Sequence, residues 1–248
     1  MSGQTMATLP LARRALPDQG RVDVWVSDLG QLPLAGPGGN MLPSHRRSQR
    51  KLRQRFVLRL LLGSYLGCPG KAVQFERGPS GKPALAASLA GSGLRFNLSH
   101  SGDWLAVAVG RDMDLGVDIE YLRELPRADA LAQRFLSPAE AQAVASLDQP
   151  ARSQRFFDFW TRREALVKAM GASMVASLGQ IRLDPASGRP LALPAGWPAL
   201  ADWTLDRPAW PAALIGALAV PGPLAGCATI CLDCRGPSPG SGLSDRPA

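Results

Sequence analysis

The sequence predicts an α+β protein with two similar lobes, because each half of the chain offers one long helix accompanied by several strands. In the first half, a basic stretch runs into an apolar one and ends near residues 63–67. In the second half, a helical pattern covers residues 152–170 and stops at Gly171. With 248 residues, 46% of them hydrophobic, the chain can bury a sizeable core, as one large domain or as two halves.

The first half contains the elements of an opening lobe, for which we expect the boundaries 21–112. A Gly-Pro-Gly-Gly run at 36–39 breaks the chain before the basic helix. Strands are expected where apolar residues alternate or run together between turn residues, at 22–26, 72–75, 94–97 and 104–109. We expect residues 1–20, before the first strand, to form a loose leader.

The second half repeats this organisation, and we assign residues 113–235 to a second lobe. Ser137, Pro138 and Glu140 form a capping box with proline at the first helical position, which predicts a helix through Leu147. Strands are expected on both sides of the helices, at 115–120, 180–183, 203–205, 213–219 and 228–232. The residues from 236 to 248 are rich in Gly, Pro and Ser and are expected to be disordered.

A net charge of +8 favours anionic partners, such as nucleic acid, an acidic protein or a phosphorylated small molecule. The basic residues concentrate at 45–55, although a solvated helix face rich in arginine would give the same pattern. No uninterrupted apolar run approaches the roughly 20 residues of a membrane span. No apolar stretch of a secretory signal follows Arg13 and Arg14. We therefore expect a cytoplasmic protein without a membrane partner.

Three of the four cysteines form a C-x3-C-x2-C pattern at Cys227, Cys231 and Cys234, a ligand spacing that some metal clusters use. They lie in the expected terminal strand, where the first two share one face and the third takes the other. Little chain remains to enclose a cluster. Buried, reduced thiols are therefore the preferred interpretation.

Three carboxylates and one amine form the most informative pattern. Asp118 and Glu120 are two residues apart in an expected strand, so both point to one face. Glu164 and Lys168 are four apart in the long helix, so they share a helix face. Such a set can hold a hard divalent metal and a polyphosphate. The alternatives are two exposed strand carboxylates and an ordinary helical ion pair.

Five short motifs follow one another along the chain: Gly-Lys-Pro at 81–83, Phe-Asn-Leu-Ser-His-Ser at 96–101, Gly-Val-Asp-Ile-Glu at 116–120, Arg-Phe-Leu-Ser-Pro-Ala-Glu at 134–140, and Trp160 with Arg163, Glu164, Ala165 and Lys168. Together they resemble the motif series of 4′-phosphopantetheinyl transferases of the surfactin-synthetase-activating type, over roughly residues 22–235. The resemblance implies two α/β lobes in a pseudo-twofold arrangement.

The resemblance also implies a reaction. An enzyme of this family, of the holo-carrier-protein synthase type, moves the phosphopantetheine arm of coenzyme A onto a carrier serine and releases adenosine 3′,5′-bisphosphate. Asp118, Glu120 and Glu164 would then ligate Mg²⁺, which prefers oxygen donors and often shares its ligands with phosphates. Lys168 would reach the pyrophosphate and the leaving-group charge. Glu140 would be the general base, unless its capping role is its only one.

The same resemblance places further residues on coenzyme A: Arg50, Lys82, Ser99, His100, Arg163 and Lys168. A turn-capping serine and surface cations are the structural alternatives for these positions. Where the family usually has lysine, this chain has Arg163, whose planar fork contacts phosphate differently from an ammonium. The family's upstream lysines have no counterpart, and Arg46 and Arg47 are candidates to replace them.

The expected partner is an acidic apo acyl or peptidyl carrier protein, which a net charge of +8 would attract. Apolar residues at 122–135 would contact this carrier, or else belong to the core. The two-lobed length predicts a monomer. Two other functions stay open: a basic nucleic-acid-binding module, for which few aromatics are interleaved, and a catalytically silent binding protein with this scaffold. No nucleic-acid partner is expected.

Overall fold

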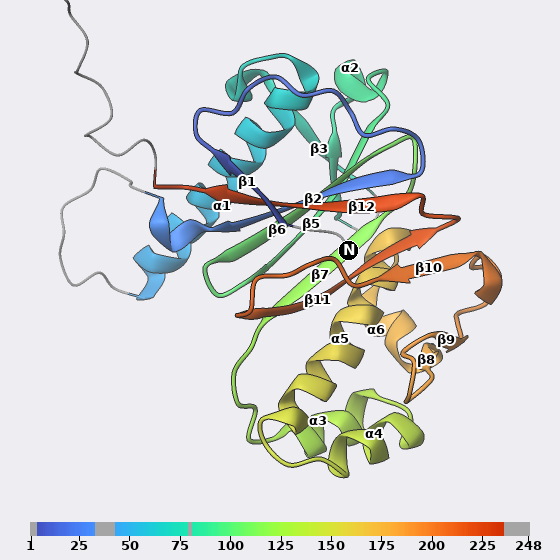
Figure 1. Ribbon diagram of the computed structural model, residues 1–248. Coiled ribbons are helices and arrows are strands. Elements are labelled where there is room, and N and C mark those ends of the chain that lie inside the picture. The colour runs from blue at the N-terminus through green and yellow to red at the C-terminus, as the bar shows by residue number, and fades with distance from the viewer. Residues whose placement is uncertain (1–3, 33–42, 79–80, 236–248) are drawn as a thin grey trace, which may run out of the picture.

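The computed structural model describes residues 4–32, 43–78 and 81–235, and it arranges them in four layers. A long helix, a five-stranded sheet, a three-stranded sheet and a second long helix follow one another from top to bottom in Figure 1. The helices are α1 (Pro43–Leu66) and α5 (Ala151–Met170). Each therefore covers the outer face of one sheet.

The first sheet has the strand order β1-β12-β2-β6-β5. The bounds of its strands are Gln4–Thr8 for β1, Gly226–Asp233 for β12, Arg21–Asp28 for β2, Trp104–Arg111 for β6 and Leu94–Ser101 for β5. Its pairs β2–β6 and β5–β6 are antiparallel, whereas β12 runs parallel to both of its neighbours.

The second sheet contains β7 (Gly116–Tyr121), β11 (Leu214–Pro221) and β10 (Trp203–Asp206), all antiparallel. The helices α3 (Ala128–Phe135) and α4 (Pro138–Ala145) pack beside α5 at the bottom of Figure 1. The smaller elements are the hairpins β3 (Phe75–Arg77) with β4 (Pro83–Leu85) and β8 (Arg182–Leu183) with β9 (Pro190–Ala192), and the short helices α2 (Ala87–Ala90) and α6 (Met174–Ser177).

The two halves of the chain repeat one topology. A strand, a long helix, a hairpin and two strands occur as β2, α1, β3–β4, β5 and β6, and again as β7, α5, β8–β9, β10 and β11. The resulting sheets, β2-β6-β5 and β7-β11-β10, have the same order. The expectation of an α+β fold with two similar lobes is confirmed.

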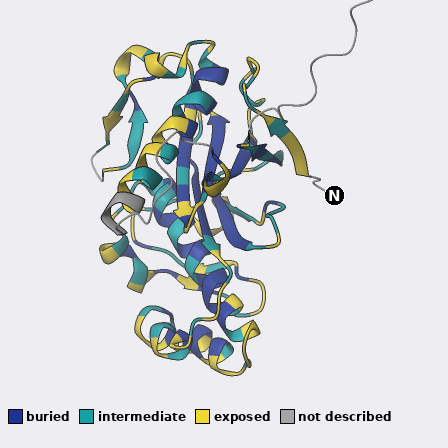
Figure 2. Ribbon diagram, turned by 90° about the vertical axis from the view of Figure 1, so that its left-hand side faces the viewer, coloured by how far each residue is buried: buried dark blue, intermediate teal, exposed yellow. Residues whose placement is uncertain are grey.

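Three hydrophobic clusters hold the layers together. One lies between α1 and the first sheet, and another between α5 and the second sheet. The third lies between the sheets and contains Val22, Val24 and Val26 of β2 together with Val117 and Ile119 of β7. Trp25, on the opposite face of β2, belongs to the α1 cluster, as strand periodicity requires. Figure 2 shows that the buried residues are concentrated in the strands.

Two expected boundaries need correction. Residues 4–8 were expected in a loose leader but form β1, an edge strand paired with β12. β12 itself was assigned to the second lobe, yet it lies beside β2 in the first sheet. Parallel pairing across some 200 residues leaves no local sequence signal, since strand periodicity says nothing of the partner. The expected break at 36–39 and the expected disordered tail lie outside the described residues.

Two expected helix signals agree with the structure. The capping box at Ser137 and Glu140 is present, and Gly171 ends α5 in the left-handed conformation. The described cysteines are free thiols, and the described residues hold no group of three His, Cys, Asp or Glu side chains that could bind a metal as it stands. Among the described residues, none of the helices has the length and apolar character needed to cross a bilayer.

Candidate active site at the seam between the sheets

The two sheets meet along β5 and β7. Hydrogen bonds between β5 side chains and the β7 backbone join these strands in place of backbone-to-backbone pairs. Three side chains of β5 accept hydrogen bonds from backbone N–H groups of β7. Asn97 Oδ1 accepts from Val117 at 3.0 Å, Ser99 Oγ from Ile119 at 3.3 Å, and Ser101 Oγ from Tyr121 at 3.0 Å. We call this contact the seam. It fixes the register of the strand that carries Asp118 and Glu120.

The face of β7 opposite the inter-sheet core points to α5. Every second residue of β7 lies on this face: Gly116, Asp118 and Glu120. A Cβ atom at Gly116 would collide with the carbonyl oxygen of Ala165 and the backbone nitrogen of Ala169. Only glycine therefore lets α5 approach β7 so closely. This approach brings Glu164 and Lys168 to the strand carboxylates.

Asp118 and Lys168 form the centre of the resulting cluster. Lys168 Nζ lies 2.6 Å from Asp118 Oδ1 and 3.7 Å from Glu164 Oε2, and donates to the Val117 carbonyl at 3.3 Å. Ser99 donates to the same Asp118 oxygen at 2.6 Å, and Ser101 donates to Glu120 Oε2 at 2.6 Å. The predicted metal carboxylates and Lys168 are thus brought together.

Burial dominates the electrostatics of this cluster. It raises the pKa of Asp118 above its usual range, against the opposing effects of the Lys168 ammonium and the Ser99 hydroxyl. Burial, followed by the neighbouring Asp118 carboxylate, raises the pKa of Glu164 to about 7. Crowded carboxylates in a poorly solvated site favour protonation unless positive charge is supplied. One lysine supplies only part of that charge.

The donor set fits a hard divalent cation. Lys168 and Arg123 supply two positive charges, the latter 3.2 Å from Glu120 Oε2. Against three carboxylates they leave the ionised cluster with one excess negative charge, which attracts a cation. Carboxylate oxygens are the ligands that such an ion prefers. In the structure as it stands, the Lys168 amine bridges Asp118 and Glu164. The part of the chain that the structure describes holds no ready-made metal cage.

His100 and Arg50 lie on the α1 side of the first sheet. His100 is exposed at the end of β5, on the face that Leu94 and Phe96 bury against α1. Arg50 Nε on α1 lies 2.9 Å from Asp103 Oδ1, in the turn after β5. Partial burial, then Lys168 and Arg50, lower the pKa of His100. The positive charges of Lys168 and Arg50 therefore both act on the imidazole of His100.

Lys82 lies beside the C-terminal end of α5. Its Nζ donates to the carbonyl oxygens of Lys168, at 2.9 Å, and Leu115, at 3.2 Å. Burial lowers the pKa of Lys82. The lysine lines a hollow of about 240 Å³ together with Pro83, Asn97, Lys168 and other residues. It therefore joins the hairpin β3–β4 to the cluster.

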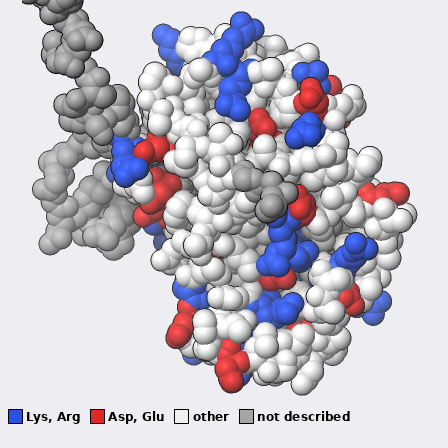
Figure 3. All heavy atoms as spheres, viewed as in Figure 1, with Lys and Arg blue, Asp and Glu red and all other residues white. Residues whose placement is uncertain are grey.

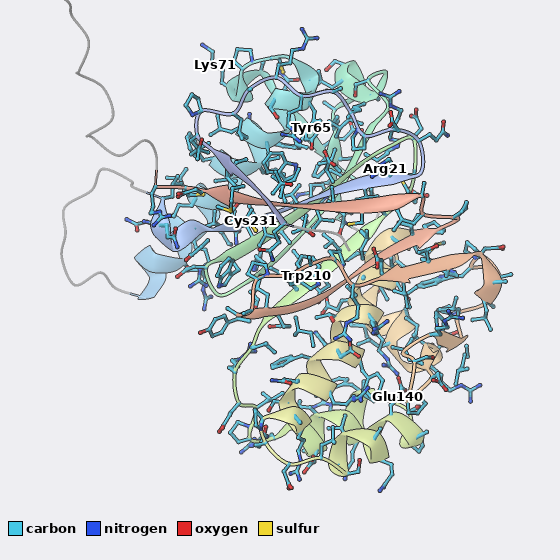
Figure 4. The ribbon with its side chains drawn as sticks, in the orientation of Figure 1. Arg21, Tyr65, Lys71, Glu140, Trp210 and Cys231 are labelled. Atoms are coloured by element: carbon cyan, nitrogen blue, oxygen red, sulfur yellow. The ribbon has the colours of Figure 1, made fainter. Side chains whose placement is uncertain are left out.

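Glu140 and Arg163 do not join the cluster, which corrects two expectations. Both side chains are fully buried, and Arg163 Nη2 lies 2.5 Å from Glu140 Oε2. Glu140 also accepts hydrogen bonds from the backbone N–H groups of Ser137, at 2.9 Å, and Leu183, at 3.2 Å. In Figure 4, Glu140 lies among the helices of the second lobe, below the sheets. A general base and a phosphate ligand both need access that these side chains lack.

Ser99 also differs from its expected role. Its hydroxyl donates to Asp118 and accepts from Ile119, so it is occupied by β7 and not directed at a ligand. Arg47, a candidate replacement for the family's upstream lysines, is exposed on α1, and the side chain of Arg46 lies outside the described residues.

The expected carrier-contacting segment, 122–135, is largely exposed or half-buried, and its leucines are half-buried. These three leucines pack against the hydrophobic cluster between α5 and the second sheet: Leu122, Leu125 and Leu131. Tyr121, at the end of β7, has 44% of its surface exposed. Figure 3 shows basic and acidic side chains interspersed on the face viewed there. The net charge of +8 is thus not gathered into one patch on that face.

Sequence reasoning missed Ser101 and Gly116, which shape the site, and Asn97, which bonds only to the backbone of β7 among the described contacts. Their signal was present, because polar residues at 97, 99 and 101 alternate in a strand whose other face is apolar. Gly116 lies two residues before Asp118, on the same face of the strand. Such a glycine indicates the close approach of another backbone.

Comparison with known proteins gives matches over most of the described chain. A model of the 4′-phosphopantetheinyl transferase superfamily matches residues 114–214, and one of the 4′-phosphopantetheinyl transferase N-terminal region matches residues 44–111. The chain is 40% identical over 141 residues to the 4′-phosphopantetheinyl transferase HetI of Nostoc sp., covering 57% of this chain and 58% of that protein.

Other relatives show the same similarity. The 4′-phosphopantetheinyl transferase AcpT of Escherichia coli is 34% identical over 150 residues, which cover 60% of this chain and 71% of AcpT. The 4′-phosphopantetheinyl transferase psf-1 of Bacillus pumilus is 35% identical over 126 residues, which cover 50% of this chain and 51% of that protein. The chain thus spans little more than half the length of HetI and psf-1.

Proposed function

The chain belongs to the 4′-phosphopantetheinyl transferase superfamily, and we propose that it transfers the 4′-phosphopantetheine arm of coenzyme A to an apo acyl or peptidyl carrier protein. In this reaction the hydroxyl oxygen of a carrier serine bonds to the β-phosphorus of coenzyme A. The bond from that phosphorus to the bridging oxygen breaks, and adenosine 3′,5′-bisphosphate leaves. The holo-carrier-protein synthase subtype is part of the proposal.

One observation carries this proposal: Asp118, Glu120, Glu164 and Lys168 converge from β7 and α5 at the seam. The three carboxylates would hold Mg²⁺, which when bound offsets the charge of the pyrophosphate and of the leaving group. Lys168 Nζ lies 2.6 Å from Asp118 Oδ1 and 3.7 Å from Glu164 Oε2. We assign to it the contact with the pyrophosphate.

The nucleotide end of coenzyme A would lie on the α1 side of the seam. His100 and Arg50 are close enough there for the guanidinium to lower the pKa of the imidazole. An anionic phosphate between them would relieve this repulsion, and arginine can hold it with two hydrogen bonds. Lys82 would add a further cation from the hairpin side. Ser99 would contribute through Asp118 instead of by direct contact.

Glu140 and Arg163 would support the reaction from the core of the second lobe. Their pair joins α4 to α5 and, through Ile181 and Leu183, to the strand β8. We therefore assign them no contact with coenzyme A or with the carrier serine. Their role is to hold the segment that carries Glu164.

The carrier would be acidic, since a net charge of +8 raises the rate of association with an anionic partner. Both halves of the cluster come from one chain, which supports action as a monomer. The cytoplasm is the location that we propose for it. Tyr121 lies exposed beside the seam, where an incoming carrier serine would arrive.

The test is to incubate the protein with coenzyme A, Mg²⁺ and a panel of apo acyl and peptidyl carrier proteins, and to measure the intact mass of each carrier. We expect at least one carrier to gain one phosphopantetheine unit. Asp118→Asn should remove this gain while circular dichroism stays unchanged. Folded wild-type protein that modifies no carrier would refute the proposed function.

A further inference from the structure

The seam follows one rule at three successive positions. Asn97, Ser99 and Ser101 of β5 each accept one backbone N–H of β7. The donors are every second residue of that strand: Val117, Ile119 and Tyr121. The side chain that precedes each of these residues lies on the α5 face, at Gly116, Asp118 and Glu120. The seam and the carboxylates therefore share one register.

The two serines make a second bond that Asn97 does not make. Ser99 donates its proton to Asp118 Oδ1, and Ser101 donates to Glu120 Oε2, both at 2.6 Å. Asn97 Oδ1 accepts from Val117, and Gly116 offers no side chain to which Asn97 could donate. A hydroxyl both accepts and donates, so serine can hold a backbone and a carboxylate at once.

The serine bonds hold one oxygen of each carboxylate and leave the other oxygen free of protein donors. Asp118 Oδ1 accepts hydrogen bonds from Ser99 and Lys168. Glu120 Oε2 accepts hydrogen bonds from Ser101 and Arg123. Asp118 Oδ2 and Glu120 Oε1 accept no hydrogen bond from any residue that the structure describes. The rotation of each carboxylate is thereby set before any ligand arrives.

We propose that Ser101 is the positioning residue of Glu120, in the same way that Ser99 positions Asp118, so that the seam aligns the two carboxylates toward a divalent cation. The inference rests on the proposed function only for the identity of the metal ligands. Ser101 is the more informative of the two serines, because Glu120 has 22% of its side chain exposed and receives no lysine among the described residues. Without Ser101, its alignment would depend on Arg123 alone.

The test compares Ser101→Ala, Ser101→Thr and the control Asn97→Ala. Asn97→Ala removes a seam bond that touches no carboxylate, so it reports the structural part of the effect. Mn²⁺ is titrated into each protein, with and without coenzyme A, and free Mn²⁺ is measured by electron paramagnetic resonance. Thermal unfolding of each variant shows how far the fold is weakened.

We expect Ser101→Ala to weaken Mn²⁺ binding about 10-fold or more, the range found for residues that orient metal ligands. Ser101→Thr keeps the hydroxyl and should restore binding to within about threefold. Asn97→Ala should lower the melting temperature but bind Mn²⁺ within about twofold of the wild type, since no carboxylate changes its partner.

Two results would overturn the inference: Ser101→Ala that binds Mn²⁺ as tightly as wild type, or Asn97→Ala that loses binding to the same extent. A wild-type protein that binds no Mn²⁺ would overturn it as well. The protein and its three variants could bind Mn²⁺ as expected although the wild type modifies no carrier. That result would support the inference and refute the proposed function. The two ideas can therefore fail separately.

Discussion

Arg163 and Glu140 form an ion pair that no solvent reaches, with Arg163 Nη2 2.5 Å from Glu140 Oε2. Arg163 also donates to the Ile181 carbonyl at 3.2 Å, so three elements of the second lobe meet at one guanidinium. The next residue on α5 is Glu164, which faces β7. The pair therefore anchors α5 at the residue next to Glu164, on a different face of the helix.

Removing one partner of this pair should destabilise the protein strongly, because the other charge would remain buried without compensation. We expect Arg163→Met to lower the free energy of unfolding by about 3–5 kcal/mol, measured by urea denaturation. Arg163→Lys should cost less, because only Nη2 of the guanidinium has hydrogen-bond partners among the described residues. Glu140→Gln that keeps full stability but loses transfer would instead make Glu140 a base.

Gly116→Ala tests the close approach of α5 to β7. The added methyl group would meet the Ala165 carbonyl, which cannot move without shifting the helix. We expect a loss of roughly 1–3 kcal/mol in unfolding free energy, as for other overpacked sites, and a fall in transfer because Lys168 moves from Asp118. Gly179→Ala is the control, since a Cβ atom there meets nothing within 4 Å. Equal behaviour of both variants would contradict the close-approach argument.

Coenzyme A binding should draw a proton onto His100. Burial, Lys168 and Arg50 lower the pKa of His100 from 6.5, with Asp118 opposing them, so the free imidazole is neutral near pH 7. A phosphate beside it would favour the charged form and raise this pKa. Binding should therefore strengthen as pH falls. Titration calorimetry in buffers of different ionisation enthalpy should detect proton uptake, and His100→Gln should abolish it. Uptake unchanged in His100→Gln would place the proton elsewhere.

Alkaline pH should weaken the fold through two thiols. Burial raises the pKa of Cys227 from 9.0 to about 12, and that of Cys234 from 9.0 to about 11. Between these values the folded chain keeps protons that the unfolded chain has lost, so stability falls as pH rises above about 9. Urea unfolding at about pH 8 and about pH 10.5 measures the loss. Cys227→Ala with Cys234→Ala should reduce it, and an unchanged slope would refute this origin.

Local sequence patterns were sufficient for most elements, because their signals lie within one helix or strand. The capping box at Ser137, the helix stop at Gly171 and the alternation around Asp118 are of this kind. The ordered motifs also predicted the family, which the comparisons confirm. The cluster of Asp118, Glu164 and Lys168 follows from the same motifs.

Contacts between distant segments were not accessible in this way. A glutamate at the third position of a capping box predicts a bond to Ser137, but not a buried arginine 23 residues later. Likewise, the hydroxyl of Ser99 was expected to face a ligand, and only the pairing of β5 with β7 directs it to Asp118. The position of β12 depends on β2, near the other end of the chain.

The return of β12 to the first sheet has a consequence for synthesis on the ribosome. β2 leaves the ribosome early, but its parallel neighbour is made only after the whole second lobe. Until then the edge of β2 stays open, and a nascent first lobe exposes unpaired backbone to other chains. The two lobes therefore cannot mature one after the other. Completion of the first depends on the last strand of the chain to be translated among those that the structure describes.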